Sequence, residues 1–237
     1  MAIEVLPITT ADIPAAVACI QRAFADDPYF KWIFNTSKLN VHRNAASLSA
    51  HLRYGINCKA PIYVAKFTPD PDQKVPIPIL TPKIVGVCWW FPPHPPSKPE
   101  SWTEWTQEWI LSFRQFLFNV RYFGRGGLNL RRYHIWKDVQ KETHDEVWVD
   151  PKGYYFCNVI AVDSEMRGMG VGRMLVDVVT ERADREGVPC YLESSKGMPN
   201  LKIYEKLGFD LVKEIECVDE RDACKLYCMT REPKLKA

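Results

Sequence analysis

The sequence lacks the patterns that mark several large classes of protein. No apolar run approaches the roughly 20 residues that a membrane span requires, and the N-terminal MAIEVLPITTADIP has no basic region followed by an apolar core. The eight cysteines form no CxxC pair, and the five histidines show no metal-ligand spacing. We therefore expect no membrane segment, no signal peptide and no metal site, and we expect free thiols in a reducing compartment, here the cytoplasm.

An excess of charge of one sign is also missing. The formal net charge of the 237 residues is +2 at pH 7, which gives no bulk attraction to nucleic acid or to an anionic membrane. One local basic run, RGGLNLRRYHIWK (125–137), is followed at once by acidic residues. This pattern favours a solvated helix face, so we expect neither nucleic acid nor a membrane as a partner.

What the sequence does contain is an alternation of two hydrophobic periodicities. Runs typical of strands alternate with runs in which apolar residues recur every three or four positions. We expect strands over 3–9, 61–67, 83–91, 154–162, 189–195, 209–218 and 223–231, and helical segments over 10–27, 42–58, 101–147, 171–187 and 200–208, with 27–35 as an aromatic connector. This order predicts an α/β fold in which a mixed sheet carries helices on both faces.

The domain organisation follows from two irregular segments. The proline-rich stretch at 66–83 lies between two strands that pair naturally, so it predicts an exposed loop and not a domain linker. The helical pair at about 101–147 is too short to be stable alone, and we expect one domain over 1–237 with this pair as an insertion. Trp102, Trp105 and Trp109 recur on one helix face, which predicts that they are buried against the sheet.

The stretch RGMGVG (167–172) lies between an apolar strand and a helix. A Walker A loop needs Lys and then Ser or Thr after its last glycine, where this chain has Arg173 and Met174. A dinucleotide fingerprint needs glycine at position 173 and further parallel strands. Glu193 lies where a ribose-binding acid would be, but only 65 residues follow the loop. The sequence therefore disfavours both of these phosphate sites.

A helix N-terminus with free backbone N–H groups remains, and it attracts an anion. Gly168, Gly170 and Gly172 would let the backbone approach a diphosphate without a Cβ in the way. A tight turn without a ligand is the alternative reading of the same glycines.

Three segments together, VIAVDSEMRGMGVG, YLESS and NLKIYEKLGF, resemble the GNAT N-acetyltransferase superfamily, and the resemblance extends from about Ile3 to Arg231. The segments RADREGVPCYLESS and YCMTREP are most similar to the puromycin-acetyltransferase type and its fungal and bacterial relatives. The resemblance implies a mixed, mostly antiparallel sheet of about seven strands flanked by helices, with acetyl-CoA as cosubstrate. The tryptophan-rich insertion goes beyond the common core of that family.

The same resemblance implies a coenzyme site. The strand at 154–162 would pair with the pantetheine arm through backbone groups, as an added strand does. The residues implied as coenzyme-binding are Ile160, Ala161, Val162, Arg167, Gly168, Met169, Gly170, Val171, Gly172, Arg173, Asn200 and Tyr204. Arg167 is equally well explained as a solvated loop cation, and Asn200 as an ordinary N-cap.

Catalytic roles are expected for two residues, Tyr204 from the resemblance and Glu193 from its place late on the strand beside the coenzyme strand. Tyr204 would donate a proton to the departing thiolate, although a core aromatic is the alternative reading. Glu193 would take the proton of the attacking ammonium, directly or through water, and a surface carboxylate is its alternative. Asp26 and Asp27 are second candidates for the base. The candidates for the acceptor pocket are Asp26, Asp27, Tyr29, Phe30, Trp32 and Trp90, most of which could equally be core residues.

The resemblance thus implies transfer of an acetyl group to a primary amine of a small molecule by direct attack, without a covalent intermediate. A protein or peptide acetyltransferase, acting on lysine or an N-terminus, is the alternative within the same enzyme class. A non-catalytic acyl-CoA sensor is the alternative of another class. We expect a monomer or a homodimer.

Overall fold

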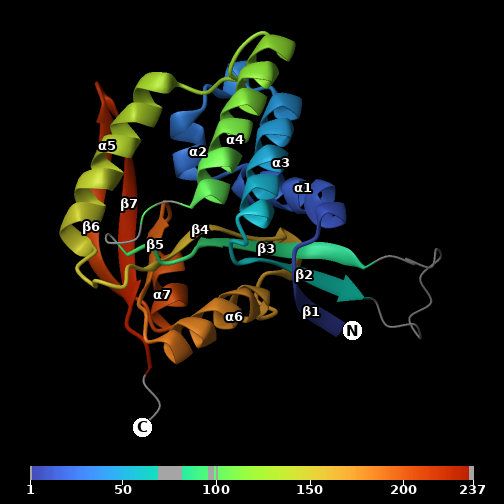
Figure 1. Cartoon of the computed structure of the whole chain (residues 1–237). Helices are drawn as coiled ribbons and strands as arrows, with labels where there is room; N and C mark the ends of the chain where they lie inside the picture. The colour runs from blue at the N-terminus through green and yellow to red at the C-terminus, as the bar shows by residue number, and fades with distance from the viewer. Residues whose placement is uncertain (1, 69–81, 96–98, 100, 235–237) are drawn as a thin grey trace.

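The computed structural model describes residues 2–68, 82–95, 99 and 101–234. A sheet of seven strands separates two layers of helices, with α1 to α5 on one face and α6 and α7 on the other (Figure 1). The elements are β1 (Ala2–Pro7), η1 (Thr10–Asp12), α1 (Ile13–Phe24), α2 (Pro28–Ile33), η2 (Thr36–Lys38), α3 (Val41–Asn57), β2 (Ile62–Thr68), β3 (Lys83–Phe91), α4 (Trp102–Arg121), α5 (Leu130–Val147), β4 (Tyr155–Val162), η3 (Ser164–Met166), α6 (Val171–Glu186), β5 (Cys190–Ser194), α7 (Asn200–Glu205), β6 (Asp210–Asp219) and β7 (Asp222–Arg231). Most of the proline-rich loop predicted at 66–83 lies outside the described residues.

The sheet has the order β1-β2-β3-β4-β5-β7-β6. Every neighbouring pair is antiparallel except β4 and β5, which are parallel. The prediction of a mixed, mostly antiparallel sheet of about seven strands between helices is therefore confirmed. The predicted hairpin at the C-terminal end is also present, as β6 and β7.

Three hydrophobic clusters hold the layers together. One lies between α6 and the sheet and contains Trp90, Tyr155 and Leu175. A second packs α1 and α3 on the first strands, and a third packs α2 and α5 on β5 to β7. Within the described part of the chain, no helix is long and apolar enough to cross a bilayer.

The segment at 27–35 is a helix and not the predicted connector. The Asp27 carboxylate accepts the backbone N–H of Phe30 at 3.2 Å, and Pro28 occupies the first turn, where its missing N–H costs nothing. The six residues of α2 thus follow α1 after a short break. This short helix brings Asp27 to the carboxyl end of β5.

The insertion is also oriented differently from the prediction. Helix α4 packs on α3, and α5 packs on β6 and α2. Trp102, Trp105 and Trp109 are exposed to solvent, so the prediction that they are buried against the sheet is wrong. The reason is that α4 uses its opposite, polar face to contact α3.

Candidate active site

The parallel pair β4/β5 separates partway along its length. Tyr155, Phe156 and Cys157 pair with Cys190, Tyr191 and Leu192, and the register ends there. From Asn158 onward β4 pairs only with β3, and from Glu193 onward β5 pairs only with β7. The sheet is therefore open at the carboxyl ends of its two parallel strands.

On the side that faces this opening, the backbone of β4 pairs with no strand among the described residues. The ladder between β3 and β4 shifts register between Trp89 and Trp90, which leaves Asn158 as the extra residue of a bulge on β4. Asp163 N–H donates to the carbonyl of Val85 on β3. Because the backbone groups of successive residues in a strand point to alternate sides, the N–H and C=O groups of Ile160 and Val162 point away from β3, toward the open edge.

Ala161 faces the other way in this ladder. It pairs with Val87 on β3, and its side chain is buried under α1 and α3. Its backbone is thus engaged on the β3 side, and we withdraw Ala161 from the predicted coenzyme contacts.

The glycine loop leads directly into α6. Gly168 and Gly170 have φ of 79° and 80°, a conformation that side chains disfavour, and a Cβ at either would meet nothing within 4 Å. Gly172 has ordinary helical backbone, with only Val162 near its Cβ position at 3.8 Å. The first two glycines therefore shape the loop, and the third does not need a special conformation.

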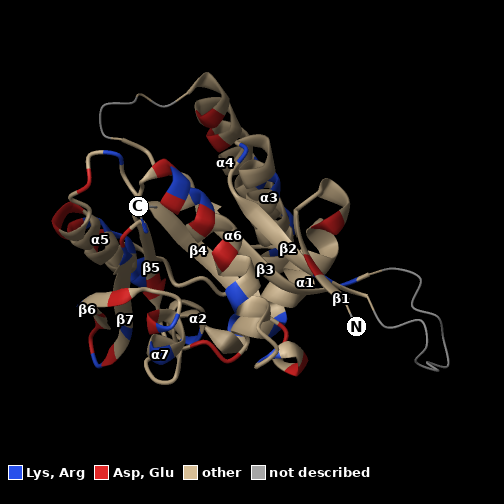
Figure 2. Ribbon diagram, turned by 90° about the horizontal axis from the view of Figure 1, so that it is seen from below, with Lys and Arg blue, Asp and Glu red and all other residues tan. Residues whose placement is uncertain are grey.

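The N-terminus of α6 presents free donors. Its first intrahelical bond runs from Met174 N–H to Gly170 O, so in the described structure the N–H groups of Val171, Gly172 and Arg173 have no backbone acceptor. The Arg173 side chain donates to the carbonyl of Lys206 at 3.0 Å and joins α6 to α7. Arg167 and Met169 are exposed on the loop, and charges of both signs follow along α6 (Figure 2).

Tyr204 lies below the opening, on the α6 side of the sheet. It is half-buried against the cluster that contains Cys157, with its ring 6.3 Å from that of Phe209. Burial raises the pKa of its phenol above the ordinary value, and Cys157 and then the Asp27 carboxylate add to the shift. Within the described residues its hydroxyl has no hydrogen-bond partner. The group is thus a protonated donor with a free O–H.

Asn200 is the first residue of α7, and Pro199 precedes it as the cap. The Asn200 side chain accepts no capping hydrogen bond, so the reading of this residue as an ordinary N-cap is wrong. It is half-buried and lies one turn from Tyr204 on the same helix.

Glu193 lies above the opening, on the α5 side. Its Oε1 accepts from the Tyr191 hydroxyl at 3.0 Å and lies 3.1 Å from Nε2 of His144. Its Oε2 accepts from Nε2 of Gln140 at 3.0 Å. The side chain is only 7% exposed, so Glu193 is not the surface carboxylate that was its alternative reading. Hydrogen bonds from Tyr191 and Gln140, together with the imidazole of His144, fix the position of this buried carboxylate.

His144, Gln140 and Tyr191 were not singled out in the sequence. Gln140 and His144 are four residues apart and therefore share a face of α5. That spacing was visible in KDVQKETHDE, but the sequence gives no sign that this face meets β5. His144 is also stacked on Trp148, with ring centroids 4.0 Å apart, which fixes the imidazole plane.

Asp26 and Asp27 have different environments. Asp27 is buried, and it accepts from Ser195 Oγ at 2.6 Å, which joins the start of α2 to the end of β5. Asp26 points to solvent and pairs with Lys31 at 3.1 Å. Only Asp27 lies beside the opening, so Asp26 is excluded as an alternative base.

The predicted acceptor aromatics fall into two groups. Trp90 is fully buried in the cluster under α6, so its assignment to the acceptor pocket is wrong. Trp32 is buried under Arg132, whose Cζ lies 5.3 Å from its ring. Tyr29 and Phe30 are half-buried, and both burial and the Glu193 charge raise the pKa of Tyr29.

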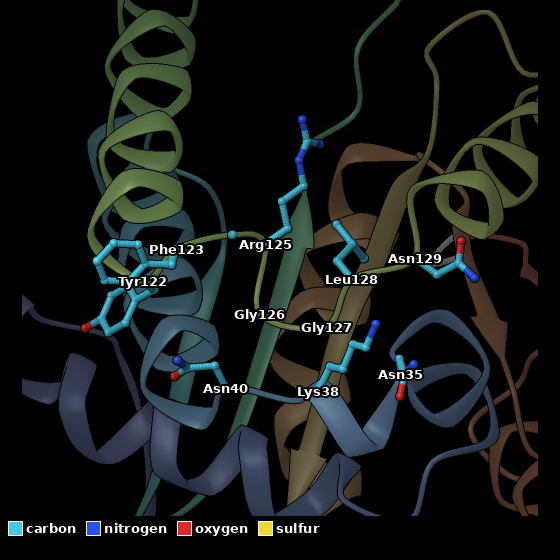
Figure 3. Close-up of a pocket in the computed structure, with 11 residues that line it drawn as sticks. Asn35, Lys38, Asn40, Tyr122, Phe123, Arg125, Gly126, Gly127, Leu128 and Asn129 are labelled. Atoms are coloured by element: carbon cyan, nitrogen blue, oxygen red, sulfur yellow. The ribbon is translucent and has the colours of Figure 1, made fainter.

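A cavity of about 470 Å³ lies elsewhere, between η2 and the α4–α5 loop (Figure 3). Lys38, Asn40, Tyr122, Phe123 and Arg125 are among the residues that line it. Neither Glu193 nor Tyr204 lines it, so this cavity is separate from the opening between β4 and β5. No group of three or more metal-ligating side chains is found among the described residues.

The residues at the opening fit acetyl-CoA. The open edge of β4 offers Ile160 and Val162 to the amides of a pantetheine arm. The glycine loop and the first turn of α6 offer N–H groups to a diphosphate, and the space in front of Gly168 and Gly170 is clear. Two features occur together here: β4 separates from β5, and β4 is followed by a helix whose N-terminus can bind a diphosphate. This combination defines the fold class of acyl-CoA-dependent acetyltransferases.

Comparison with known proteins gives the family. The model of the acetyltransferase (GNAT) family matches residues 84–209. The chain belongs to the GNAT acetyltransferase family. The matched region runs from β3 through β4, α6 and α7 and so contains the whole opening.

Two Schizosaccharomyces pombe proteins whose names describe them as uncharacterized N-acetyltransferases are similar in sequence. One is 28% identical over 61% of this chain and 62% of its own length, and the other is 33% identical over 42% and 37%. The chain thus spans less than two thirds of either relative.

Solved structures share the fold. A Corynebacterium glutamicum structure described as histone acetyltransferase HPA2 and related acetyltransferase has a TM-score of 0.57 at 23% identity, over 100% of this chain and 99% of its own. Arylalkylamine N-acetyltransferase 2 from Aedes aegypti has a TM-score of 0.54 at 17% identity, over 99% and 100%. The yncA structure from Salmonella typhimurium, which contains acetyl-CoA, has a TM-score of 0.51 at 13% identity, over 100% and 97%.

Proposed function

We propose that the protein transfers an acetyl group from acetyl-CoA to a primary amine of a small molecule, by direct attack of the amine in a ternary complex. The observation that carries the proposal is the placement of Glu193 and Tyr204. They approach the opening between β4 and β5 from opposite faces of the sheet, where no strand separates them. A base on one side and an acid on the other is the arrangement that aminolysis of a thioester needs.

Acetyl-CoA supplies the acetyl group as a thioester. Residues of this chain bind it by the backbone of Ile160 and Val162 and by the N–H groups of the loop and the first turn of α6. Bound in this way, the thioester would lie at the opening, with the N–H groups of the β4 edge available to its carbonyl oxygen.

Glu193 accepts the proton that the ammonium must lose before its lone pair can attack. Oε2 receives one hydrogen bond, from Gln140, and so keeps a lone pair for that proton or for a bridging water. Tyr191 and His144 hold Oε1. Tyr204 provides the proton for the departing thiolate, because its raised pKa keeps the hydroxyl protonated at neutral pH.

Direct attack by the amine is supported by the protonation state of the cysteine thiol beside the opening. Cys157 is the cysteine beside the opening, and burial raises its pKa well above the ordinary value. It is therefore a neutral thiol at physiological pH, and a neutral thiol is a poor nucleophile.

The position of α5 over the Glu193 side of β5 supports a small acceptor. This helix packs on β6 and brings Gln140 and His144 onto Glu193, so the acceptor side of β5 is roofed by the protein itself. A peptide acceptor would need an open groove at this position. For this reason we favour a small amine over a protein or peptide acceptor.

We also propose that residues 1–237 form one catalytic unit, because α4 and α5 of the insertion pack on α3 and β6. The cytoplasm remains our proposed location. It is supported by the eight cysteines, all within the described residues and all unpaired.

A thiol-release assay with acetyl-CoA tests the function. The panel should contain polyamines, arylamines, aminoglycosides, amino acids and a lysine peptide. We expect release of CoA with at least one small amine, and loss of most of that rate in Glu193→Gln. Tight acetyl-CoA binding without transfer to any amine would instead identify a sensor module, and turnover with the peptide alone would overturn the small-acceptor assignment.

A further inference from the structure

Helix α4 turns its polar side chains toward the protein. Gln115 Oε1 accepts from Arg43 Nη2 at 3.0 Å and from Ser47 Oγ at 3.1 Å, and Asn119 Oδ1 accepts from the same Arg43 nitrogen at 2.8 Å. Near the start of the helix, Gln107 accepts from Asn57 on α3 at 2.8 Å. These bonds fix which face of α4 points outward.

The outward face of α4 is apolar along its whole length, which we call the α4 stripe. Its members recur every three or four residues and so lie on one face of the helix. They are Trp102, Trp105, Trp109, Phe113, Phe116, Val120 and, just after the helix, Phe123. The six aromatic residues among them are between 49% and 98% exposed. Soluble monomers rarely expose a continuous apolar patch of this size.

The exposed area matches what one partner buries in a stable complex. If a fully exposed aromatic side chain presents about 200 Å², the six rings present about 800 Å² at the exposures given. A standard protein–protein interface buries about 800 Å² on each partner. The α4 stripe alone is therefore sufficient for an interface.

We propose that the α4 stripe pairs with the α4 stripe of a second copy of this chain, with the two helices antiparallel across a two-fold axis. A two-fold interface requires a surface that is complementary to itself. The stripe meets this requirement, because its positions are nearly symmetric about a point between Ser112 and Phe113. Reversal about this point exchanges Trp102 with Phe123, Trp105 with Val120, and Trp109 with Phe116.

The charges on α4 favour the antiparallel orientation. Glu104 and Glu108 lie in its first half, and Arg114 and Arg121 lie in its second half. Antiparallel pairing keeps the acidic first half of one helix away from the acidic first half of the other, and it also aligns the two helix dipoles favourably. Figure 2 shows the acidic segments near the start of α4 on an otherwise mostly uncharged helix.

These charges disfavour a membrane as the occupant of the stripe. An interfacial membrane helix carries a polar face rich in lysine and arginine. Helix α4 has as many acidic as basic residues and no lysine, so we place a second protein copy on the stripe and not a lipid surface.

The two ends of the stripe complement one another. Phe123 is 98% exposed and lines the cavity between η2 and the α4–α5 loop together with Tyr122 (Figure 3). Trp102, at the other end, is 82% exposed. Antiparallel pairing brings the Trp102 ring of one copy to Phe123 and this cavity in the other. Both protruding rings are then covered.

Sedimentation equilibrium of the full chain tests the proposal. We expect a dimer at micromolar concentration, and a dissociation constant raised about 100-fold or more in Trp109→Glu, because central aromatic residues carry most of an interface's energy. The matched control is Val149→Glu, which changes an 80% exposed apolar residue outside α4 and should leave the dimer intact. The circular dichroism of both variants should equal that of the native chain.

Cysteine cross-linking tests the orientation. Ser112→Cys lies at the axis and should form a disulfide between two copies, whereas Trp102→Cys alone should not, because two such cysteines would be about 30 Å apart at 1.5 Å per residue. A mixture of Trp102→Cys and Phe123→Cys should cross-link. The proposal is overturned if the native chain is monomeric at 100 µM, if Trp109→Glu dimerises as the native chain does, or if Trp102→Cys cross-links with itself. Flotation of a monomeric native chain with phosphatidylcholine vesicles would overturn it in favour of a membrane.

Discussion

The Nε2 atom of His144 on α5 lies 3.1 Å from Oε1 of Glu193 on β5, although 49 residues separate them in the chain. In this contact the imidazole can donate to the carboxylate only through a proton on Nε2, because an ionised carboxylate has no proton to give. The same contact connects the helical insertion to the edge of the opening between β4 and β5. Through it, α5 both covers the proposed acceptor side and positions the proposed base.

The contact between Glu193 and His144 predicts different effects on the rate when each of the two residues is substituted. Glu193→Gln removes the proton acceptor, so kcat with a verified amine should fall about 100-fold at pH 7, within the range for a general base. The loss should shrink as the pH rises, because the amine then arrives deprotonated. Rates measured from pH 6 to pH 10 check this.

His144→Gln is the matched variant. Its amide can still donate to Glu193, so the rate should stay within about fivefold of the native value if His144 only positions the carboxylate. A fall as large as that of Glu193→Gln, with the same recovery at high pH, would transfer the role of base to the imidazole. A pH-independent defect in Glu193→Gln would leave Asp27 as the next candidate.

Tyr204→Phe should separate chemistry from binding. The ring packs beside Phe209 and Cys157, and phenylalanine keeps that packing. The hydroxyl is lost, so kcat should fall about 10- to 100-fold, at the low end for a general acid because a CoA thiolate is a good leaving group. The KM for acetyl-CoA should change little. A variant that turns over at the native rate would make Tyr204 a core residue.

The element order and the glycine loop were predictable because both depend on neighbours in the sequence. Gly168 and Gly170 lie between a strand and a helix, and the backbone has the positive φ that glycine permits. The antiparallel hairpin of β6 and β7 likewise follows from two strand-like runs joined by a short turn.

The contacts of Glu193 and the orientation of α4 were not predictable in this way. Gln140 and His144 share a face of α5, but only tertiary packing decides that this face meets β5. The tryptophans of α4 recur at helical spacing, which shows that they share a face but not which way the face points. Here hydrogen bonds from α3 to Gln107, Gln115 and Asn119 turn the aromatic face outward, against the usual preference.

Gly170→Val should weaken acetyl-CoA binding. Gly170 has φ of 80° at the cap of α6, and a β-branched residue strongly disfavours that conformation. The loop would shift and its N–H groups would no longer converge, so the dissociation constant should rise at least tenfold, about 1.4 kcal/mol. Calorimetric titration with acetyl-CoA measures it.

Gly172→Ala provides the control for Gly170→Val. It adds a Cβ in ordinary helical backbone with only Val162 nearby, at 3.8 Å, so the fold tolerates it. The affinity should stay within about threefold of the native value, since the conformation of the loop is retained. Unchanged affinity in a folded Gly170→Val would contradict the assigned role of the loop.

The last prediction concerns stability and pH at the junction of α6 and β7. Arg231 Nη1 and Nη2 donate to the two oxygens of Asp184 at 2.7 and 2.8 Å, and the Arg231 side chain is buried. These hydrogen bonds lower the pKa of Asp184 below its ordinary value. A carboxylate whose pKa is lowered on folding stabilises the fold at pH values above its unfolded pKa of about 3.9, and this contribution is lost as the pH falls through the folded-state pKa. Asp184→Asn should therefore lower the free energy of unfolding by about 2 kcal/mol at pH 7, and the difference from the native chain should disappear near pH 2.

Asp177→Asn on the same helix is the control with the opposite sign, because burial raises the pKa of Asp177. Removing the charge of Asp177 should therefore leave the stability at pH 7 unchanged or higher. Urea denaturation of the three proteins at pH 7, 4 and 2.5 measures both differences, and an Asp184→Asn deficit that stays constant over this range would show that packing, and not the charge of Asp184, holds α6 on β7.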